Sequence, residues 1–156
     1  MEGPRWLDDD EARAWRGFLR MHQVLRAVLE GELTRATGLS LPDYEVLVAL
    51  SEVDGRRLRM GALAERLTWT PSRLSHQLTR MQDRGLVRRE DCPTDARGAF
   101  AVPTKTGLTA ITEAAPGHLA GVRRHLFDRL TADQVRALAE ISEAVAGSGS
   151  PSYGDV

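Results

Sequence analysis

The fold of this chain is decided by residues 69–85, the stretch WTPSRLSHQLTRMQDRG. Thr70 is a good N-cap, since its hydroxyl can accept a hydrogen bond from a free amide in the first turn of a helix. Pro71 suits the first helical position, where a missing N–H costs nothing, and Gly85 marks the end of the helix. The stretch therefore predicts a short amphipathic helix. Its inner face follows the spacing i, i+4, i+7 and consists of Leu74, Leu78 and Met81.

The opposite face of this predicted helix carries hydroxyl, imidazole and guanidinium groups, because successive residues turn by about 100° around the axis. Such groups can enter the major groove of DNA and hydrogen-bond to base edges and phosphates. The alternative interpretation is an ordinary solvated helix face. Arg73 is the best candidate for a guanine contact, whereas Thr79 and Arg80 are expected to reach phosphates. The candidate DNA-binding residues of the helix are Ser72, Arg73, Ser75, His76, Thr79 and Arg80.

A predicted β-hairpin follows the helix. Val87 opens one short extended run, and Phe100 and Val102 alternate in a second run, as strand residues do. Between the two runs lie Pro93 and Gly98, which are turn-forming residues. A hairpin of this kind, with arginines along it and near its tip, is typical of a DNA-binding wing.

The helix, the glycine and the basic hairpin together make a winged helix-turn-helix, and their motifs resemble those of the MarR family of bacterial transcriptional regulators. The resemblance rests on GLVRR at 85–89, PTDARG at 93–98 and PTKTG at 103–107, and it extends over about residues 10–146. It implies a mainly α fold with a small β-hairpin wing, in which N- and C-terminal dimerisation helices flank the winged helix-turn-helix. It also implies an intertwined homodimer.

The resemblance assigns roles to the residues of the wing. Arg97 resembles the family arginine that enters the minor groove, where narrow A·T-rich tracts attract it. Asp95 matches the wing aspartate of the family, and we expect it to orient Arg97 or a neighbouring arginine, because a carboxylate would be repelled by DNA. Arg88 and Arg89 are either phosphate contacts or charges on a strand edge.

Composition and charge fit this interpretation. A chain of 156 residues has the length of a single domain and is long enough to bury a hydrophobic core. The net charge is −1, yet residues 56–97 hold ten arginines against five acidic residues, and such a local excess suits phosphate contacts. The sequence contains no apolar run of 18 residues and no signal-type segment, so we expect a soluble, cytoplasmic protein without a membrane partner.

The two ends of the chain carry amphipathic helical patterns that a small winged domain cannot cover by itself. We therefore expect a homodimer whose two half-sites lie about 34 Å apart on a pseudo-palindromic operator of double-stranded DNA. We divide the chain into a flexible N-terminus at 1–10, a single MarR-like domain at 11–146 and a disordered tail at 147–156. Within the domain we expect the winged helix-turn-helix at about 41–103 and the dimerisation helices at about 11–37 and 104–146.

Three further residues have two interpretations each. Trp15 and His22 lie where the family binds small aromatic acids and phenols, so they either form an effector pocket or are a core tryptophan and a satisfied histidine. Cys92, the single cysteine, excludes an intrachain disulfide. It lies near Arg88 and Arg89 in the sequence, and their positive charges would lower the pKa of its thiol. Cys92 is therefore either a redox sensor or a structural cysteine.

The sequence therefore predicts a sequence-specific DNA-binding transcriptional regulator, a repressor released by a small aromatic effector. The alternatives are a winged-helix protein–protein interaction module without DNA binding, and a redox-sensing regulator acting through Cys92. We expect no enzyme, since the sequence holds no Ser/His/Asp constellation and no phosphate-binding glycine loop. We expect no cofactor and no metal, because His76 has no cysteine or histidine at ligand spacing.

Overall fold

The computed structural model describes residues 5–92 and 95–147, with the backbone alone for residues 95–97. The expected disordered tail lies outside this range from residue 148 onward, as do residues 1–4 of the expected flexible N-terminus. The helices and strands of the described residues are α1 (Asp9–Thr37), α2 (Leu41–Ser51), β1 (Leu58–Arg59), α3 (Met60–Leu67), α4 (Pro71–Asp83), β2 (Val87–Cys92), β3 (Asp95–Pro103), α5 (Lys105–His125) and α6 (Ala132–Ala146), with short 3₁₀ turns at Asp54–Arg56 and Phe127–Arg129.

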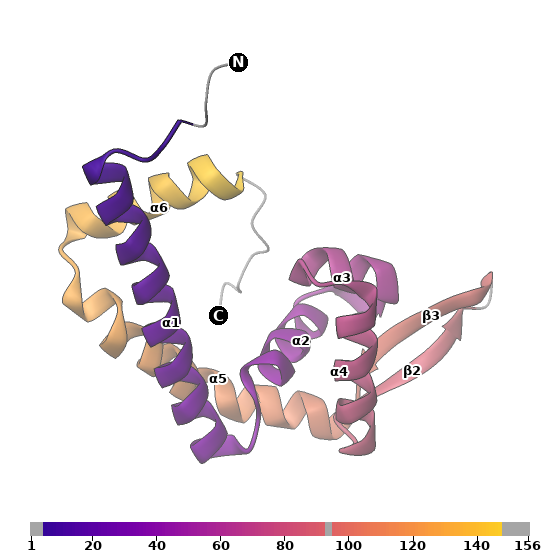
Figure 1. Cartoon of the computed structure of the whole chain (residues 1–156). Coiled ribbons are helices and arrows are strands. Elements are labelled where there is room, and N and C mark those ends of the chain that lie inside the picture. The colour runs from indigo at the N-terminus through magenta and orange to yellow at the C-terminus, as the bar shows by residue number, and fades with distance from the viewer. Residues whose placement is uncertain (1–4, 93–94, 148–156) are drawn as a thin grey trace.

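The elements fall into two groups (Figure 1). α2, α3, α4 and the β-hairpin lie together as a winged helix-turn-helix, while α1 and α6 lie on the other side of the molecule. α5 runs beneath both groups and connects them, and it continues without interruption through Pro116. The predicted mainly α fold with a small β-hairpin wing is confirmed.

α1 begins at Asp9 rather than at Glu11, where the sequence places its start, because Asp8 caps it. Asp8 Oδ1 accepts a hydrogen bond from the Glu11 amide at 2.8 Å, and the Glu11 carboxylate accepts one from the Asp8 amide at 3.0 Å. This reciprocal capping box satisfies two amides that the helix leaves free. The helix ends at Thr37, as predicted, where Gly38 adopts a φ of 74° that favours glycine.

α4 is the helix that the sequence predicts most fully. Thr70 caps it through a hydrogen bond from the Arg73 amide at 3.3 Å, and Pro71 occupies its first position. Gly85 ends it with a φ of 70°, and the amide of Leu86 donates to the carbonyl of Met81 at 2.9 Å, as in a glycine-terminated helix. The predicted inner face is buried: Leu74, Leu78 and Met81 are each at most 1% exposed.

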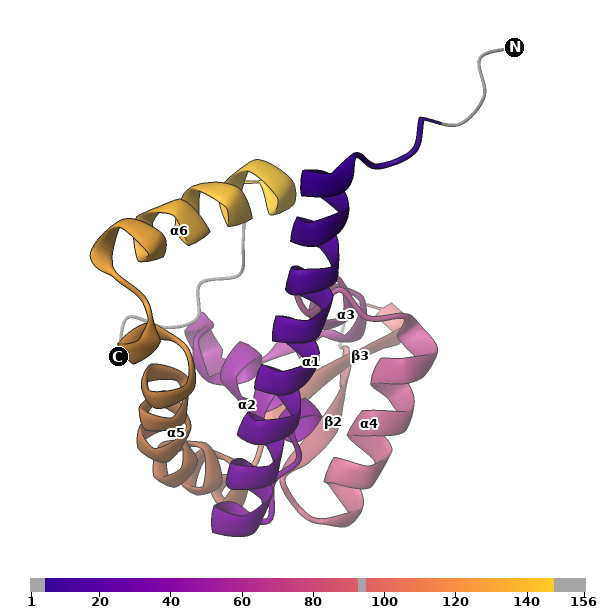
Figure 2. The same cartoon turned by 60° about the vertical axis from the view of Figure 1, so that its left-hand side comes forward.

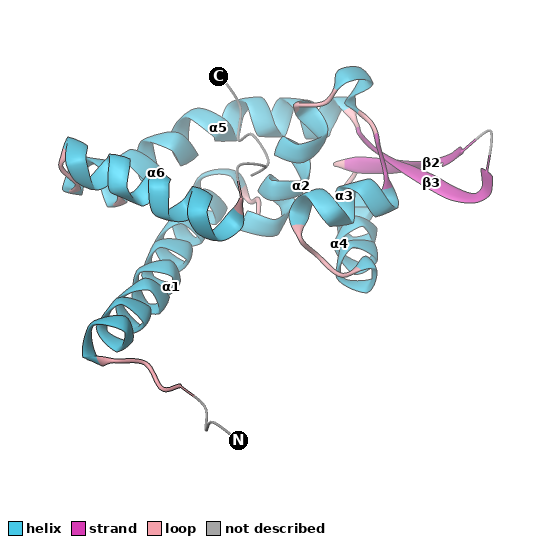
Figure 3. Ribbon diagram, turned by 90° about the horizontal axis from the view of Figure 1, so that it is seen from above, coloured by secondary structure: helices cyan, strands magenta, loops and turns pink. Residues whose placement is uncertain are grey.

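The three strands form one antiparallel sheet in the order β1-β3-β2. Leu58 pairs with Ala101, so the short β1 lies beside β3. β2 and β3 form the hairpin, which projects beyond the helices (Figure 3). Near the tip the register jumps, because Asp91 pairs with Ala99 but Cys92 pairs with Asp95. The intervening residues 96–98 therefore form a bulge, a feature that bends and twists a strand.

The hydrophobic core lies among α2, α3, α4 and the sheet, with contributions from α1 and α5. Burying this apolar surface is the main force that holds the winged lobe together. Its fully buried side chains include Val46, Leu47, Leu50, Leu63, Leu78 and Met81, each 0% exposed. Gly107 at the start of α5 allows a close approach, since a Cβ there would stand 2.0 Å from the Leu86 carbonyl oxygen.

α1 and α6 expose large apolar side chains. α6 projects as an arm beyond α5 (Figure 2), and no residue within Ala132–Ala146 is buried. The exposed apolar side chains of α1 and α6 are Trp15, Phe18, Leu19, Met21, Val24, Ile141 and Val145.

Candidate DNA-binding surface

The polar face of α4 points away from the core that holds its apolar stripe. Five of the six predicted DNA-binding residues of the helix are exposed, and Ser75 is half-buried. Thr79 Oγ1 donates to the carbonyl oxygen of Ser75 at 3.0 Å, and Arg80 donates to the side-chain oxygen of Gln77. The exposed residues are Ser72, Arg73, His76, Thr79 and Arg80.

Arg89 connects the wing to this helix. Its Nη2 atom donates to the Ser75 carbonyl oxygen at 3.0 Å and lies 3.2 Å from Thr79 Oγ1 and 3.4 Å from Ser75 Oγ. The sequence left two interpretations open for Arg89, a phosphate contact or a strand-edge charge. The structure adds a third role, because the guanidinium is held against two of the predicted DNA-binding side chains.

Arg88, the neighbour of Arg89 in β2, points elsewhere. Its Nε and Nη2 atoms both donate to Glu90 Oε1, at 2.9 and 2.7 Å. The Arg88 side chain remains 54% exposed, so solvent screens this pair, and exposed pairs of this kind contribute little to stability. Arg88 therefore stays accessible at the strand edge, and a phosphate contact remains a prediction.

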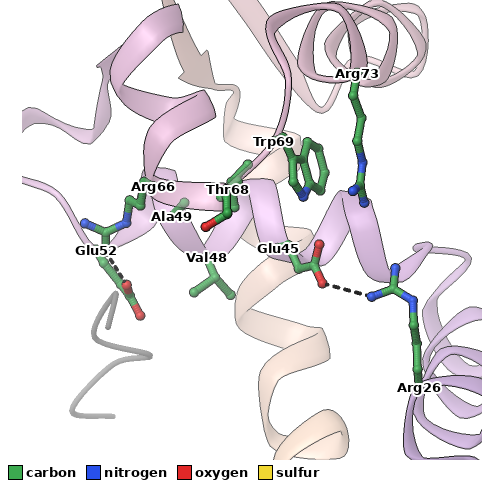
Figure 4. A pocket seen from close by; sticks show the side chains of 10 residues that line it. Arg26, Glu45, Val48, Ala49, Glu52, Arg66, Thr68, Trp69 and Arg73 are labelled. Carbon is green, nitrogen blue, oxygen red and sulfur yellow. Dashed lines mark hydrogen bonds and ion pairs between the residues drawn. The ribbon is translucent and has the colours of Figure 1, made fainter. Parts of the chain in front are cut away.

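Arg73 folds back against its own lobe. The Cζ atom of its guanidinium lies 4.1 Å from the centre of the Trp69 ring, a distance typical of a cation–π contact. Figure 4 shows the Arg73 side chain descending beside the indole toward Glu45. The residue predicted to read a base is thus packed on an aromatic face in this structure.

A cavity of about 290 Å³ lies beneath the start of α4. Its lining comes from α1, α2, the end of α3 and the start of α4, and it includes Arg26, Glu45, Trp69 and Arg73. Arg26 Nη1 lies 3.6 Å from Glu45 Oε1, and Arg66 Nη2 lies 2.7 Å from Glu52 Oε2 (Figure 4). The cavity therefore combines an indole face with several charged groups.

Burial raises the pKa of Glu45, although the positive charges of Arg26 and Arg73 act in the opposite direction. Removing a carboxylate from water disfavours its charged form, and here this effect exceeds the attraction of both guanidinia. No sequence pattern indicates this cavity, because its residues come from four separate segments. Only Trp69 and Arg73 were part of the stretch that predicts the fold.

A second, larger cavity of about 820 Å³ lies between α1 and α5. His118 lines it and contacts the ring of Tyr44, with ring centres 4.4 Å apart. Its Nδ1 atom is buried and has no hydrogen-bond partner among the described residues, and burial lowers the pKa of His118.

The predicted effector residues lie elsewhere. Trp15 stacks on Phe18 with ring centres 5.9 Å apart, and Phe18 stacks on His22 at 6.5 Å. Trp15 is 53% exposed, so it is not a core residue of the single subunit. Neither Trp15 nor His22 lines the two cavities described above. Their assignment to an effector pocket remains a prediction.

The wing tip can be described only by its backbone. Asp95 and Arg97 belong to β3, and their side chains lie outside the described residues, so their predicted roles remain predictions. Cys92 is 6% exposed, and its sulfur accepts a hydrogen bond from Arg59 Nη2 at 3.2 Å. The arginine that contacts Cys92 is therefore Arg59, on β1, whereas the guanidinia of Arg88 and Arg89 bind Glu90 and Ser75.

Every helix in residues 5–92 and 95–147 is too short or too polar to span a bilayer. Within the same residues, no three histidine, cysteine, aspartate or glutamate side chains gather closely enough to hold a metal ion.

The chain is similar to known proteins of one family. Residues 37–98 match a family model described as the MarR family. The transcriptional regulator HosA of Escherichia coli O111:H- is 33% identical over 109 residues, which cover 64% of this chain and 79% of HosA. The resemblance inferred from the motifs at 85–107 is thereby confirmed.

Two solved structures from Streptomyces coelicolor are more similar over a greater length. AbsC, a MarR family transcriptional regulator, is 45% identical, covers 92% of this chain and 96% of its own, and superposes with a TM-score of 0.86. Sco3205, another MarR family transcriptional regulator, was crystallised in complex with DNA; it is 42% identical, covers 98% and 96% of the two chains, and has a TM-score of 0.88. This chain belongs to the MarR family of transcriptional regulators.

Proposed function

We propose that this chain is a sequence-specific DNA-binding regulator that acts as a homodimer. The observation that carries the proposal is the burial pattern of α4, whose apolar stripe is in the core while Ser72, His76 and Thr79 remain exposed on the other side. A helix held by one face, with hydrogen-bonding groups on the free face, suits the major groove. Similarity to Sco3205, which was crystallised with DNA, supports the same function.

The homodimer is proposed from the uncovered apolar faces. α1 and α6 expose Phe18, Val24, Ile141 and Val145, and burial against a second copy would remove this surface from water. Two-fold symmetry would then present two recognition helices to successive major grooves of a pseudo-palindromic operator. The wing arginines, with Arg97 foremost, would contact the backbone and the minor groove beside each half-site.

We further propose that the protein is a repressor released by a small molecule. The cavity beneath α4 supports this, because Arg73 lies in its wall. A ligand that engaged the Arg73 guanidinium would withdraw it from a base contact, so ligand and DNA would oppose each other. Such coupling is reciprocal: the small molecule lowers the affinity for DNA by the same factor by which DNA lowers the affinity for the small molecule. The effector site at Trp15 and His22 stays a separate prediction.

Binding to a selected duplex tests the DNA-binding function. The full chain would select a duplex from a random 30-bp library, and fluorescence anisotropy would compare it with a scrambled duplex at several salt concentrations. We expect a clear preference for the selected duplex and a steep loss of affinity as salt rises, since phosphate contacts release counterions. Equal affinity for both duplexes would contradict sequence specificity, and no binding to either duplex would favour a winged-helix protein–protein module instead.

A further inference from the structure

Asp43 is a charged side chain in the interior of the winged lobe. It lies in the first turn of α2 and is 1% exposed, and Gln77 on α4 is 4% exposed. Charged side chains are almost never fully buried unless they are paired. Asp43 is the N3 residue of the capping box that Ser40 begins, a position that is usually near solvent. Its burial therefore calls for a second role.

The two oxygens of Asp43 bind one residue of the recognition helix and the residue that follows it. Oδ1 accepts a hydrogen bond from Gln77 Nε2 at 2.7 Å, and Oδ2 accepts one from Arg84 Nη1 at 2.6 Å. Oδ2 also accepts the Ser40 amide at 2.9 Å, which completes the capping box of α2. Arg80 donates to the free oxygen of Gln77, so the Gln77 amide is held at both ends.

Arg84 extends this network to the end of α1. Its Nη2 atom donates to the carbonyl oxygen of Gly38 at 3.0 Å, while its Nη1 atom binds Asp43. Gly38 is the residue that terminates α1. The guanidinium thus joins three elements: the end of α1, the start of α2 and the residue that follows α4.

This arrangement can fix the rotation and the axial position of α4. Gln77 and Arg84 are seven residues apart, which places them two turns apart on one side of the helix, about 10 Å along its axis. The apolar stripe of Leu74, Leu78 and Met81 gives burial, but hydrophobic attraction has no direction. Hydrogen bonds to a buried carboxylate are directional and charge-assisted. Two of them at separate points leave the helix little freedom to slide or turn.

We propose that Asp43 is a positioning residue for DNA recognition, which sets the angle at which α4 presents Ser72, Arg73, Ser75 and His76. The inference rests on the proposed DNA-binding function and deepens it. Base readout depends on hydrogen bonds to base edges, whose geometry tolerates little error. Phosphate attraction tolerates far more, because it acts over a Debye length. A misplaced α4 therefore loses sequence preference while it keeps general affinity for DNA.

The test separates positioning from stability by measuring a ratio. The wild type first selects a duplex from a random 30-bp library, and each variant is then titrated with that duplex and with a scrambled duplex of the same composition at equal salt. We expect Asp43→Asn and Arg84→Met to lower the ratio of the two affinities at least tenfold. The scrambled duplex should bind within about threefold of the wild type. Arg84→Lys keeps the charge but not the fork of two donors, and should fall between Arg84→Met and the wild type.

Val46→Ala is the matched control, because Val46 lies on α2, is 0% exposed and takes no part in the network. It should lower the melting temperature while it leaves the ratio within twofold of wild type. Circular dichroism would confirm that each variant is folded at the titration temperature. If folded Asp43→Asn and Arg84→Met retain the wild-type ratio, the positioning role is wrong although the protein binds DNA. If the wild type itself prefers no duplex, the proposed function fails instead.

Discussion

The guanidinium of Arg73 lies 4.1 Å from the centre of the Trp69 ring and faces the cavity that Glu45 and Arg26 help to line. Base reading by Arg73 would require this side chain to leave the indole and extend from α4. The cation–π contact is worth about 0.5–1 kcal/mol at an exposed site, which is less than the 1–3 kcal/mol or so of a good bidentate contact to guanine. DNA can therefore draw Arg73 away from Trp69.

The first prediction concerns Arg73 itself. Arg73→Lys keeps the charge but removes the bidentate fork, so we expect affinity for the selected duplex to fall by about tenfold, which corresponds to roughly 1.4 kcal/mol. Affinity for a scrambled duplex should hardly change. Titrations with single-base variants of the duplex would check this. Unaltered preference at every base pair would remove Arg73 from the reading surface.

The second prediction compares two adjacent arginines of β2. Arg89 is tied to Ser75 and Thr79 on α4, whereas Arg88 pairs with Glu90. Arg89→Ala frees the wing from the recognition helix and should weaken binding to the selected duplex at least tenfold. Arg88→Ala removes the same charge and should weaken it by no more than about threefold, as expected for loss of one phosphate contact. Equal losses in the two variants would show that charge alone matters.

The third prediction uses pH to distinguish two glutamates. Burial raises the pKa of Glu45, so its folded form prefers the proton and its charged form costs stability as pH rises through the folded pKa. Glu45→Gln should therefore raise the melting temperature at pH 7, and its advantage should vanish as pH falls below the pKa of glutamate in the unfolded chain. A lower melting temperature at pH 7 would mean that the pair with Arg26 outweighs the burial.

Glu32 should behave in the opposite way. Its hydrogen bonds with His125 and Arg124 lower its pKa, so its contribution to stability is present above the unfolded pKa and is lost as pH falls through the folded pKa. Glu32→Gln should lower the melting temperature at pH 7 and converge with the wild type in acid. Differential scanning fluorimetry across pH 4–8 would measure the melting temperatures of both variants and of the wild type. The prediction is the sign of each variant's difference from the wild type.

The fourth prediction tests the proposed dimer. Ile141 on α6 is 61% exposed, and Ile141→Glu would place a charge in the interface between copies. We expect sedimentation velocity to show a single subunit and the selected duplex to bind about 100-fold more weakly, since two linked half-sites bind with avidity. Ser142→Glu adds the same charge at the next position, on another side of α6, and should sediment as the wild type does. A dimer that survives Ile141→Glu would place the interface elsewhere.

The fifth prediction uses two glycines of α5. A Cβ at Gly107 would stand 2.0 Å from the Leu86 carbonyl oxygen, whereas a Cβ at Gly117 meets nothing within 4 Å. Gly107→Ala should destabilise the fold by about 3 kcal/mol through overpacking. Gly117→Ala should stabilise it by about 0.5–1 kcal/mol, because alanine is the better helix former. Urea unfolding measures both, and a stable Gly107→Ala protein would contradict the close packing of α5 on Leu86.

Local signals in the sequence predicted most of the winged lobe. The predicted cap Thr70 accepts the expected amide hydrogen bond, and Ser40, Thr104 and Thr131 cap their helices in the same way. Caps and apolar spacing act within one helix, so they can be read from a few neighbouring residues. The same locality explains why the hairpin after Gly85 was predicted together with its arginines.

Contacts between distant segments could not be predicted in this way. The Asp43–Gln77 hydrogen bond joins residues 34 positions apart, and Gln77 appeared in the sequence as one more polar residue of α4. Arg89 likewise gave no sign that it would turn toward Ser75. The cavity around Arg73 draws its lining from four segments. Each of these features depends on tertiary packing, which a periodic pattern does not encode.

The bond from Arg89 to the Ser75 carbonyl ties the hairpin to the recognition helix, so the two would approach a duplex as one unit. Motion of one against the other would then be restricted before DNA is bound, so that binding to both grooves would cost less entropy. A change in groove shape at one edge of a half-site would then weaken the contacts of α4 with its bases, and a wrong base under α4 would weaken the contacts of the wing. Sequence variants at the flanks and at the centre of an operator should accordingly prove non-additive.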